Sequence, residues 1–372
     1  MIDLLNTLIQ GVASMTWKQG LMIVIGLVLI YLAIKKEYEP MLLLPIGFGA
    51  ILTNIPFSAA VTEEGFLSIL YNAGIRTELF PILIFIAVGA MIDFSPLLKQ
   101  PVMLLFGAAA QFGIFAAMLL AAATGMFSLR EAASIGIIGA ADGPTSIYVA
   151  SRFAQEYFGP ISVAAYSYMS LVPIIQPPVI KALTTKKERM IRMDADFDVK
   201  VSKKVLILFP ILVTLIAGLI APVSVGLVGS LMFGNLIREC GVLERLSKTA
   251  QNELTNLVTL LLGITIGSTM VANKFIAWDT ILILGIGLLA FVFDTAGGVL
   301  FAKFLNLFLK KKVNPMIGAA GISAFPMSAR IVQRMAQKED PTNFILMQAI
   351  GANVSGQIGS IIAGGVLLAL LA

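Results

Sequence analysis

The stretch GIIGAADGPTSIYVASRF, residues 136–153, decides how this chain must fold. Apolar sequence flanks it on both sides, whereas its centre holds glycines, Pro144 and a single carboxylate, Asp142. Glycine and proline interrupt a helix at this point, and a charge in hydrocarbon costs about 3 kcal/mol or more unless it faces a partner or a polar cavity. Irregular backbone at membrane depth persists only where protein or water covers it. An ion-binding site in an interrupted membrane helix accounts for both features.

The composition is that of an integral membrane protein with several spans. Of the 372 residues, 58% are hydrophobic and only 13% are charged, whereas soluble domains are roughly a quarter charged. Uncharged runs at 21–34, 205–220 and 280–293 approach, with their flanks, the roughly 20 residues that a helix needs to cross a bilayer. We expect an all-α polytopic membrane protein with about ten to eleven hydrophobic segments, several of them short or broken.

Several kinds of chemistry are excluded by the residues that the sequence lacks. There is no histidine, and the single cysteine, Cys240, rules out an internal disulfide and a cysteine-cluster metal site. No GxxxxGK[ST] or GxSxG motif occurs, and no Met-Lys-Met surrounds a lysine for biotin attachment. The net charge of +5 fits cytoplasmic loops and not nucleic-acid binding. The N-terminal residues 1–15 lack a basic start and a cleavage site, so no removable signal peptide is expected.

One polar segment divides the chain. Residues 184–204, TTKKERMIRMDADFDVKVSKK, are rich in Lys and Arg, which places them in the cytoplasm, and Lys310, Lys311 and Lys312 argue the same for the loop after 308. We expect an N-terminal membrane helix at 1–39, a first repeat at 40–183, this cytoplasmic linker at 184–204 and a second repeat at 205–372.

The halves on either side of the linker resemble each other at three places. The matched pairs are GFGAILTNIP (47–56) with GSLMFGNLIRE (229–239), ELFPILIFIAVGAMI (78–92) with ELTNLVTLLLGITIG (253–267), and GAADGPTSIYVASRF (139–153) with GISAFPMSARIVQRM (321–335). Repeats with interrupted segments at corresponding places are typical of secondary transporters, whose ions bind where the broken helices meet near the midplane. If each half has an odd number of spans, the repeats are inverted, and this is the arrangement we expect.

Asp142 is the first candidate for chemistry. A hard cation such as Na⁺ prefers oxygen ligands, and carbonyls freed by Gly139, Gly143 and Pro144 could join the carboxylate and the hydroxyls of Thr145 and Ser146. The alternative is a solvated aspartate in a loop between two spans.

The matching segment of the second half is NPMIGAAGISAFPMSAR, 314–330. Asn314, Ser323 and Ser328 offer uncharged oxygens. The Arg330 fork suits a carboxylate, and it could equally neutralise Asp142 when no cation is bound. The alternative is close helix packing through small residues, with Arg330 extended to the surface.

Two further segments follow the broken ones. YSYMSLVPIIQPP (166–178) carries Tyr166, Tyr168 and Gln176, and GANVSGQIGS (351–360) carries Asn353 among glycines. Buried hydroxyls and amides need partners, so these side chains could line a polar path, or else anchor at the interface and bond between helices. Asp294, in a long apolar segment, is a secondary candidate.

These motifs, taken in order, resemble a known family. GAADGPTSIYVASRF, YSYMSLVPIIQPP, DTAGGVLFAKFLNLF (294–308), NPMIGAAGISAFPMSAR and DPTNFILMQAIGANVSGQIGS (340–360) are similar to the beta subunits of sodium-pumping biotin-dependent decarboxylases, which include oxaloacetate, methylmalonyl-CoA, glutaconyl-CoA and malonate enzymes. The resemblance runs from about residue 45 to the C-terminus. The chain has GANVSG where the family pattern is GPNVAG, and it is shorter than oxaloacetate-type members, which favours an acyl-CoA-type system.

The resemblance implies a function and a set of partners. The beta subunit decarboxylates carboxybiotin, presented by a separate biotin carrier protein, with uptake of a proton, and it exports Na⁺. A carboxyltransferase alpha subunit and a small gamma or delta membrane subunit complete the complex, which lies in a bacterial-type cytoplasmic membrane. A homo-oligomer is expected.

The resemblance also implies roles for individual residues. It assigns cation and proton handling to Asp142 and a catalytic role to Tyr168 and Arg330. It implies substrate binding by Arg330 and Ser323, and sodium binding by Asp142, Asn314, Gly318, Ser323 and Asn353. Two other functions stay open on the residues alone: a stand-alone sodium-coupled carboxylate symporter or sodium/proton antiporter, and a membrane scaffold without transport, which leaves Asp142 in its broken segment unexplained.

Overall fold

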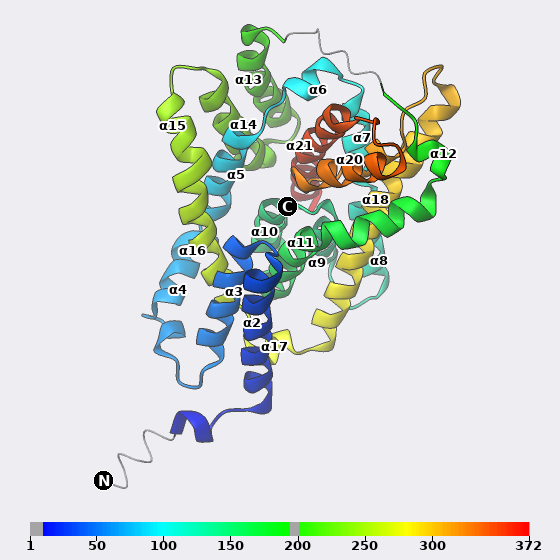
Figure 1. Ribbon diagram of the computed structural model, residues 1–372. Coiled ribbons are helices and arrows are strands. Elements are labelled where there is room, and N and C mark those ends of the chain that lie inside the picture. Colours follow the sequence, from blue (N-terminus) through cyan, green and yellow to red (C-terminus); the bar gives the residue numbers. More distant parts are fainter. Residues whose placement is uncertain (1–9, 194–200, 372) are drawn as a thin grey trace.

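The computed structural model describes residues 10–193 and 201–371, and within these parts every regular element is a helix (Figure 1). Residues 1–9, the first part of the segment on which the signal-peptide prediction depends, and residues 194–200 in the middle of the linker lie outside the described residues.

Within residues 10–193 and 201–371, six helices are long and apolar enough to cross a membrane. They are α2 (Trp17–Lys36), the stretch Met103–Ala123 formed by α7 (Met103–Ala109) and α8 (Phe112–Ala123), α11 (Phe158–Leu183), α13 (Lys203–Ile220), α18 (Trp278–Phe308) and α21 (Leu346–Leu371). A seventh candidate is the pair of α3 (Pro40–Asn54) and the stretch Ala59–Ile75, which is bent by 105°. The prediction of a polytopic all-α membrane protein is confirmed in this coarse form.

The other apolar segments form shorter helices, which is why the number of hydrophobic segments exceeds the number of long spans. These are α5 (Leu79–Met91), α14 (Val225–Glu239) and α16 (Thr255–Ser268). The remaining α-helices are α4 (Phe66–Leu70), α6 (Ser95–Lys99), α9 (Leu129–Gly136), α10 (Gly143–Phe153), α12 (Lys186–Arg189), α15 (Glu244–Thr249), α17 (Ala272–Phe275), α19 (Met316–Ala319) and α20 (Met327–Glu339). The 3₁₀ turns are η1 (Ala59–Val61), η3 (Ile137–Ala140) and η4 (Pro222–Ser224), and the π turns are η2 (Tyr71–Ile75) and η5 (Ala250–Leu254).

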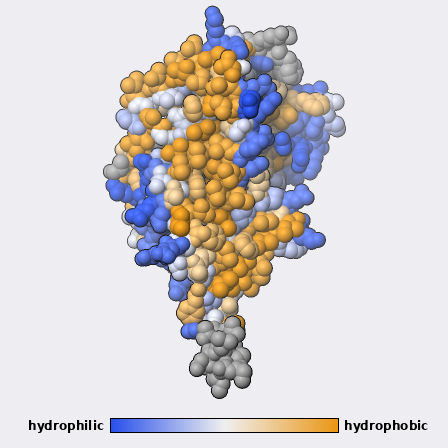
Figure 2. Space-filling view, turned by 90° about the vertical axis from the view of Figure 1, so that its left-hand side faces the viewer, coloured by the Kyte–Doolittle hydropathy of each residue, from blue (hydrophilic) through white to orange (hydrophobic). Residues whose placement is uncertain are grey.

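Apolar side chains are abundant on the outside of the molecule. On α13, Leu208, Leu212, Leu215 and Leu219 are each at least half exposed, and Figure 2 shows apolar side chains over most of the middle of one face. Soluble monomers rarely expose so large a continuous apolar surface. This surface is the one that lipid would cover.

The two halves are joined by two crossings of similar construction. Helix α3 packs on α16 where Gly49 meets Gly267, and α5 packs on α14 where Gly89 meets Gly234. A Cβ added at Gly49 would lie 2.4 Å from the Ile264 carbonyl oxygen. Each crossing therefore pairs one helix of the first half with one helix of the second, at backbone contact that only glycine permits.

Other local features recur in both halves. The π turn η2 precedes α5, and the π turn η5 precedes α16. The Ser146 hydroxyl donates to the Ile137 carbonyl at 3.3 Å, and the Ser328 hydroxyl donates to the Ala319 carbonyl at 3.1 Å. These parallels agree with the expected internal repeat, which the proposal below takes up.

The basic segments gather at one end of the molecule. In Figure 1, α12 and the end of α18, which leads to Lys310, lie at the upper right, whereas α17 and the bend beside α4 lie at the bottom. Both predicted cytoplasmic loops are thus on the same side, which we call the linker side.

We predict that Gly234→Ala destabilises the fold. The added Cβ would lie 1.9 Å from the Ile86 carbonyl oxygen, so α5 and α14 must separate, at a cost of about 1–3 kcal/mol. Thermal unfolding of the detergent-purified protein measures the effect as a lower Tm. The matched control is Gly285→Ala in α18, where a Cβ meets nothing within 4 Å. Equal Tm values for the two variants would contradict the account of the crossing.

Candidate functional site

The first half is interrupted at Asp142. Helix α9 ends at Gly136, the 3₁₀ turn η3 follows, and Ala141 has a left-handed backbone with φ of 53°. Asp142 is the N-cap of α10, and Gly143 and Pro144 open that helix. Aspartate is a preferred N-cap and proline fits the first helical turn, so this sequence ends one helix and starts the next at the carboxylate.

The Asp142 carboxylate is held by hydroxyl groups. Its side chain is 5% exposed, and its Oδ2 accepts from the Thr145 hydroxyl at 2.6 Å and from the Ser360 hydroxyl at 2.8 Å. The N-terminus of α10 also favours a negative charge here. Among the described residues, no lysine or arginine forms an ion pair with Asp142. The carboxylate therefore has hydrogen-bond donors but no cationic partner.

The interrupted segment of the second half lies against the first. Between α19 and α20 the chain runs through residues 320–326, and the Ser323 backbone N–H donates to the Ala140 carbonyl at 3.0 Å. The Ser323 hydroxyl donates to the Gly356 carbonyl at 2.7 Å. The two broken segments are thus in direct contact beside Asp142.

One face of α21 closes the site. Asn353, Gln357 and Ser360 are spaced to share this face: the Asn353 amide donates to the Ile322 carbonyl at 2.6 Å, the Gln357 amide donates to the Ser323 carbonyl, and Ser360 bonds Asp142. The Asn353 Oδ1 atom is buried without a hydrogen-bond partner among the described residues. This oxygen is available to a ligand.

The structure brings three of the predicted residues into one cluster, namely Asp142, Ser323 and Asn353. Ser360 joins them although sequence reasoning did not single it out. The sequence spacing could have identified Ser360, because it lies seven residues after Asn353, on the same face of a helix.

The two tyrosines of α11 have different surroundings from those expected. Tyr168 donates its hydroxyl to the Leu284 carbonyl of α18 at 2.6 Å. The ring of Tyr166 lies against Gly143, where a Cβ would come within 2.2 Å of it, and its buried hydroxyl has no partner among the described residues. Residues two apart on a helix point to nearly opposite sides, so the Tyr166 ring packs on Gly143, next to Asp142, whereas the Tyr168 hydroxyl points to α18.

Asn314 belongs to a different group of contacts, which we call the linker clamp. Its amide donates to the carbonyls of Arg189 at 2.8 Å and Ile191 at 2.9 Å, and the Asn343 amide reaches the Ile191 carbonyl at 3.2 Å. Arg189 forms an ion pair with Glu339 at 2.7 Å. The amide side chains therefore hold the start of the linker on the second half.

Arg192 continues this attachment on the linker side. Its guanidinium pairs with Asp340 at 2.7 Å, and hydrogen bonds from Thr342 and Arg192 lower the pKa of Asp340 to about 2. Asp340 is therefore ionised at any physiological pH.

Gly318 and Arg330 also lie apart from the cluster's hydrogen bonds. Gly318 packs backbone to backbone on Gly298 of α18. Arg330 is exposed on α20, and within the described parts of the chain its guanidinium has no hydrogen bond or ion pair. In this conformation Arg330 therefore does not pair with Asp142, as the alternative of charge neutralisation would require.

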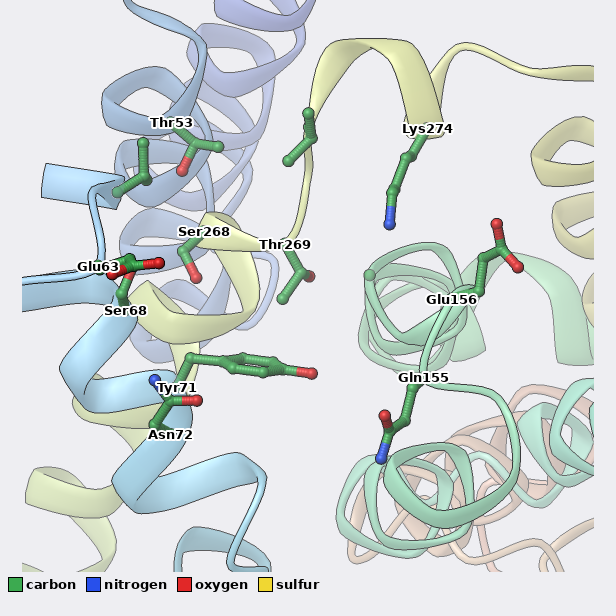
Figure 3. Close-up of a pocket in the computed structure, with 13 residues that line it drawn as sticks. Thr53, Glu63, Ser68, Tyr71, Asn72, Gln155, Glu156, Ser268, Thr269 and Lys274 are labelled. Carbon is green, nitrogen blue, oxygen red and sulfur yellow. The ribbon is translucent and has the colours of Figure 1, made fainter. Parts of the chain in front are cut away.

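A polar cavity of about 570 Å³ opens at the end of the molecule opposite the linker side (Figure 3). It lies between the ends of α3 and α16, the turn η2, the α10–α11 connection and α17. Figure 3 shows Tyr71 and Lys274 extending into this space from opposite sides, with Glu156 beside it. Its lining contains none of the predicted site residues.

Fold and site together define a polytopic membrane protein with a buried carboxylate at an interrupted helix, an arrangement typical of ion-translocating proteins. The family described as "Na+-transporting oxaloacetate decarboxylase beta subunit" matches residues 18–371. The chain is 50% identical to the methylmalonyl-CoA decarboxylase subunit beta of Propionigenium modestum, over 94% of each chain. It is 50% identical to the glutaconyl-CoA decarboxylase subunit beta of Acidaminococcus fermentans, over 99% of this chain and 97% of that one.

A third relative extends the range of substrates named. The oxaloacetate decarboxylase beta chain of Klebsiella pneumoniae is 45% identical over 99% of each chain. The protein therefore belongs to the family of beta subunits of Na⁺-transporting decarboxylases, membrane-embedded subunits that couple decarboxylation to sodium transport. The resemblance found in the sequence motifs is confirmed.

We predict that Asn314→Ala loosens the linker. The carbonyls of Arg189 and Ile191 lose their shared donor, and each lost hydrogen bond is worth about 1 kcal/mol, so trypsin should cleave the linker several times faster. Asn343→Ala should act in the same direction. An unchanged cleavage rate with a large rise in the Na⁺ concentration needed for activity would contradict the clamp and favour direct sodium binding by Asn314.

Proposed function

We propose that the Asp142 cluster is the sodium site of a carboxybiotin-driven pump. The observation that carries the proposal is the buried Asp142 carboxylate, which has two hydroxyl donors and no cationic side chain among the described residues. A buried charge without a counter-ion is costly, and Na⁺ supplies the missing charge.

The residues of this cluster offer oxygen ligands for Na⁺. The proposed set is the Asp142 carboxylate, the Ser360 hydroxyl, the unpartnered Asn353 Oδ1 and an oxygen of Ser323. Hard cations prefer such oxygens. Asn314 and Gly318, which the family resemblance also implied, take supporting roles in this proposal, because the Asn314 amide is engaged by the linker and Gly318 by Gly298.

The chemical step is the decarboxylation of carboxybiotin, delivered by a separate biotin carrier. The N–C bond of the N-carboxylate breaks, CO₂ leaves, and the biotin nitrogen takes up one proton. We assign Arg330 to the carboxylate, because its guanidinium is exposed on α20, the helix that packs on α12, and its fork matches two oxygens. Asp142 then releases Na⁺ as it accepts a proton, with Tyr168 retained as a second candidate proton carrier.

Transport requires that the site face each side of the membrane in turn. We propose that the two halves are inverted repeats and that the polar cavity opposite the linker is the outer mouth. Gly159 of α11 lines this cavity, and Tyr166, which packs on Gly143, lies seven residues further along the same helix. At 1.5 Å per residue the two are only about 10 Å apart.

The beta subunit requires partners for this cycle. We propose a carboxyltransferase alpha subunit, a biotin carrier protein and a small gamma or delta membrane subunit, within a bacterial cytoplasmic membrane, and a homo-oligomer of the beta chain. An acyl-CoA is the proposed upstream substrate. The shorter chain and the 50% identity to two acyl-CoA-type relatives support it.

We predict that Asp142→Asn abolishes Na⁺-stimulated decarboxylation of carboxybiotin and ²²Na⁺ uptake by the assembled complex in proteoliposomes, with assembly intact.

Ser360→Ala should raise the half-saturating Na⁺ concentration roughly tenfold, because a hydrogen bond to a charged group is worth about 1.5–3 kcal/mol. The matched control is Ser151→Ala, whose buried hydroxyl bonds only the Tyr148 carbonyl of its own helix.

Full pumping by Asp142→Asn would reject the site. Na⁺-driven carboxylate flux by the beta chain alone, without a biotin protein, would reject carboxybiotin decarboxylation as its function.

A further inference from the structure

A second carboxylate is buried in the middle of α18. Asp294 is 0% exposed, and its Oδ1 accepts the backbone N–H of Gly113 and, at 3.2 Å, that of Ile114. These two residues stand in the first turn of α8, just after the break that separates α7 from α8. Asp294 therefore caps a helix of the first half from a helix of the second.

The other carboxylate oxygen has no such explanation. Asp294 Oδ2 is buried and has no hydrogen-bond partner among the described residues. A Cβ added at Gly139 would lie 2.7 Å from it, so this oxygen rests against the turn η3. Gly139 is three residues before Asp142. Two buried carboxylates thus flank the same short segment.

Further oxygens without partners lie close in the sequence. Thr295 Oγ1 and Gln111 Oε1 are both buried and unpaired within the described residues, and the two side chains are 0% and 4% exposed. Thr295 follows Asp294 directly, and Gln111 precedes α8, the helix that Asp294 caps. Native structures satisfy most buried polar atoms, whereas α18 and the residue before α8 each carry a buried polar atom that the described residues leave unsatisfied.

The neighbouring elements supply no counter-charge. Helices α7, α8 and α19 and the turn η3 pack on α18, and their sequences contain no charged side chain. The other titratable groups on elements packed against α18 are Arg130 and Glu131 of α9 and Tyr166, Tyr168 and Lys181 of α11, with Asp142 next to η3. Arg130 binds the Leu371 carbonyl and Glu131 binds Ser128, and neither reaches Asp294.

Capping alone does not account for this residue. A serine or asparagine satisfies helix N–H groups as well as aspartate does, without placing a charge in an apolar interior. Capping uses Oδ1 and leaves Oδ2 free.

We propose that Asp294 is a second cation-binding carboxylate, which takes up a monovalent cation, Na⁺ or a proton, at Oδ2. The cation neutralises the charge beside Gly139 and so acts on the segment that ends at Asp142. The proposal rests on the family's sodium transport and not on the assignment of Asp142.

Infrared difference spectroscopy of the assembled complex tests this directly. Spectra are recorded with Na⁺ against K⁺, and across a pH series without Na⁺, for the wild type and for Asp142→Asn. In Asp142→Asn we expect a carboxyl band that still responds. A response to Na⁺ identifies sodium, and a response to pH alone identifies the proton. No remaining carboxyl response to either would overturn the proposal, whether or not variants of Asp294 fold.

Asp294→Asn supplies the second arm. The amide oxygen can still accept from Gly113 and Ile114, so the complex should assemble. The infrared band should disappear, and either the half-saturating Na⁺ concentration should shift at least tenfold or the pH midpoint of decarboxylation should shift by at least about one unit. Asp279→Asn is the matched control, because Asp279 is a half-buried carboxylate at the start of the same helix that accepts only from Tyr157.

If Asp294→Asn keeps the wild-type dependence on Na⁺ and pH, Asp294 serves only as a helix cap and the proposal is refuted. This test is independent of the one on Asp142. Full activity in Asp142→Asn would refute the sodium site proposed above, and the measurements on Asp294 would still hold.

Discussion

The carboxyl group of Asp142 is buried where a helix is interrupted, and in the described part of the chain no lysine or arginine pairs with it. Several features of the structure serve to make that burial tolerable. The N-terminus of α10 points at the carboxylate, and the hydroxyls of Thr145, in α10 itself, and of Ser360, in α21, donate to it. Charge-assisted hydrogen bonds are stronger than neutral ones, but donors only spread the charge and do not cancel it. In the function proposed above, a small mobile cation completes the site, and its binding and release then carry an energy large enough to be coupled to a chemical step.

The site is assembled from both halves of the chain. Asp142 and Thr145 come from the first half, whereas Ser323, Asn353 and Ser360 come from the second. The contact between the two broken segments runs through backbone atoms, from the Ser323 N–H to the Ala140 carbonyl. Glycine crossings between α3 and α16 and between α5 and α14 bring the same halves together elsewhere. A relative movement of the halves would therefore change the ligand set proposed for Na⁺ directly, without a long chain of intermediate contacts.

Much of this could be predicted from the sequence, because composition and helix-breaking residues act locally. The apolar runs predict the spans, and Gly143 and Pro144 predict the break that isolates Asp142. The side on which a helical residue lies depends instead on packing. The family resemblance points to Tyr168, whose hydroxyl bonds the Leu284 carbonyl, whereas it is the ring of Tyr166 that packs on Gly143 beside Asp142. Asn314 lies in a motif next to the break, but its amide holds the linker. Such partners are far apart in the sequence, and no local pattern reveals them.

The central claim is that Asp142 holds sodium at the contact between the two broken segments. The most direct test is a pair of high-resolution structures of the complete complex, one in Na⁺ and one in K⁺. The account predicts ion density in Na⁺ alone, in contact with the Asp142 carboxylate and with oxygens of α21. Sodium density that is coordinated elsewhere in the membrane region, with Asp142 uninvolved, would contradict it.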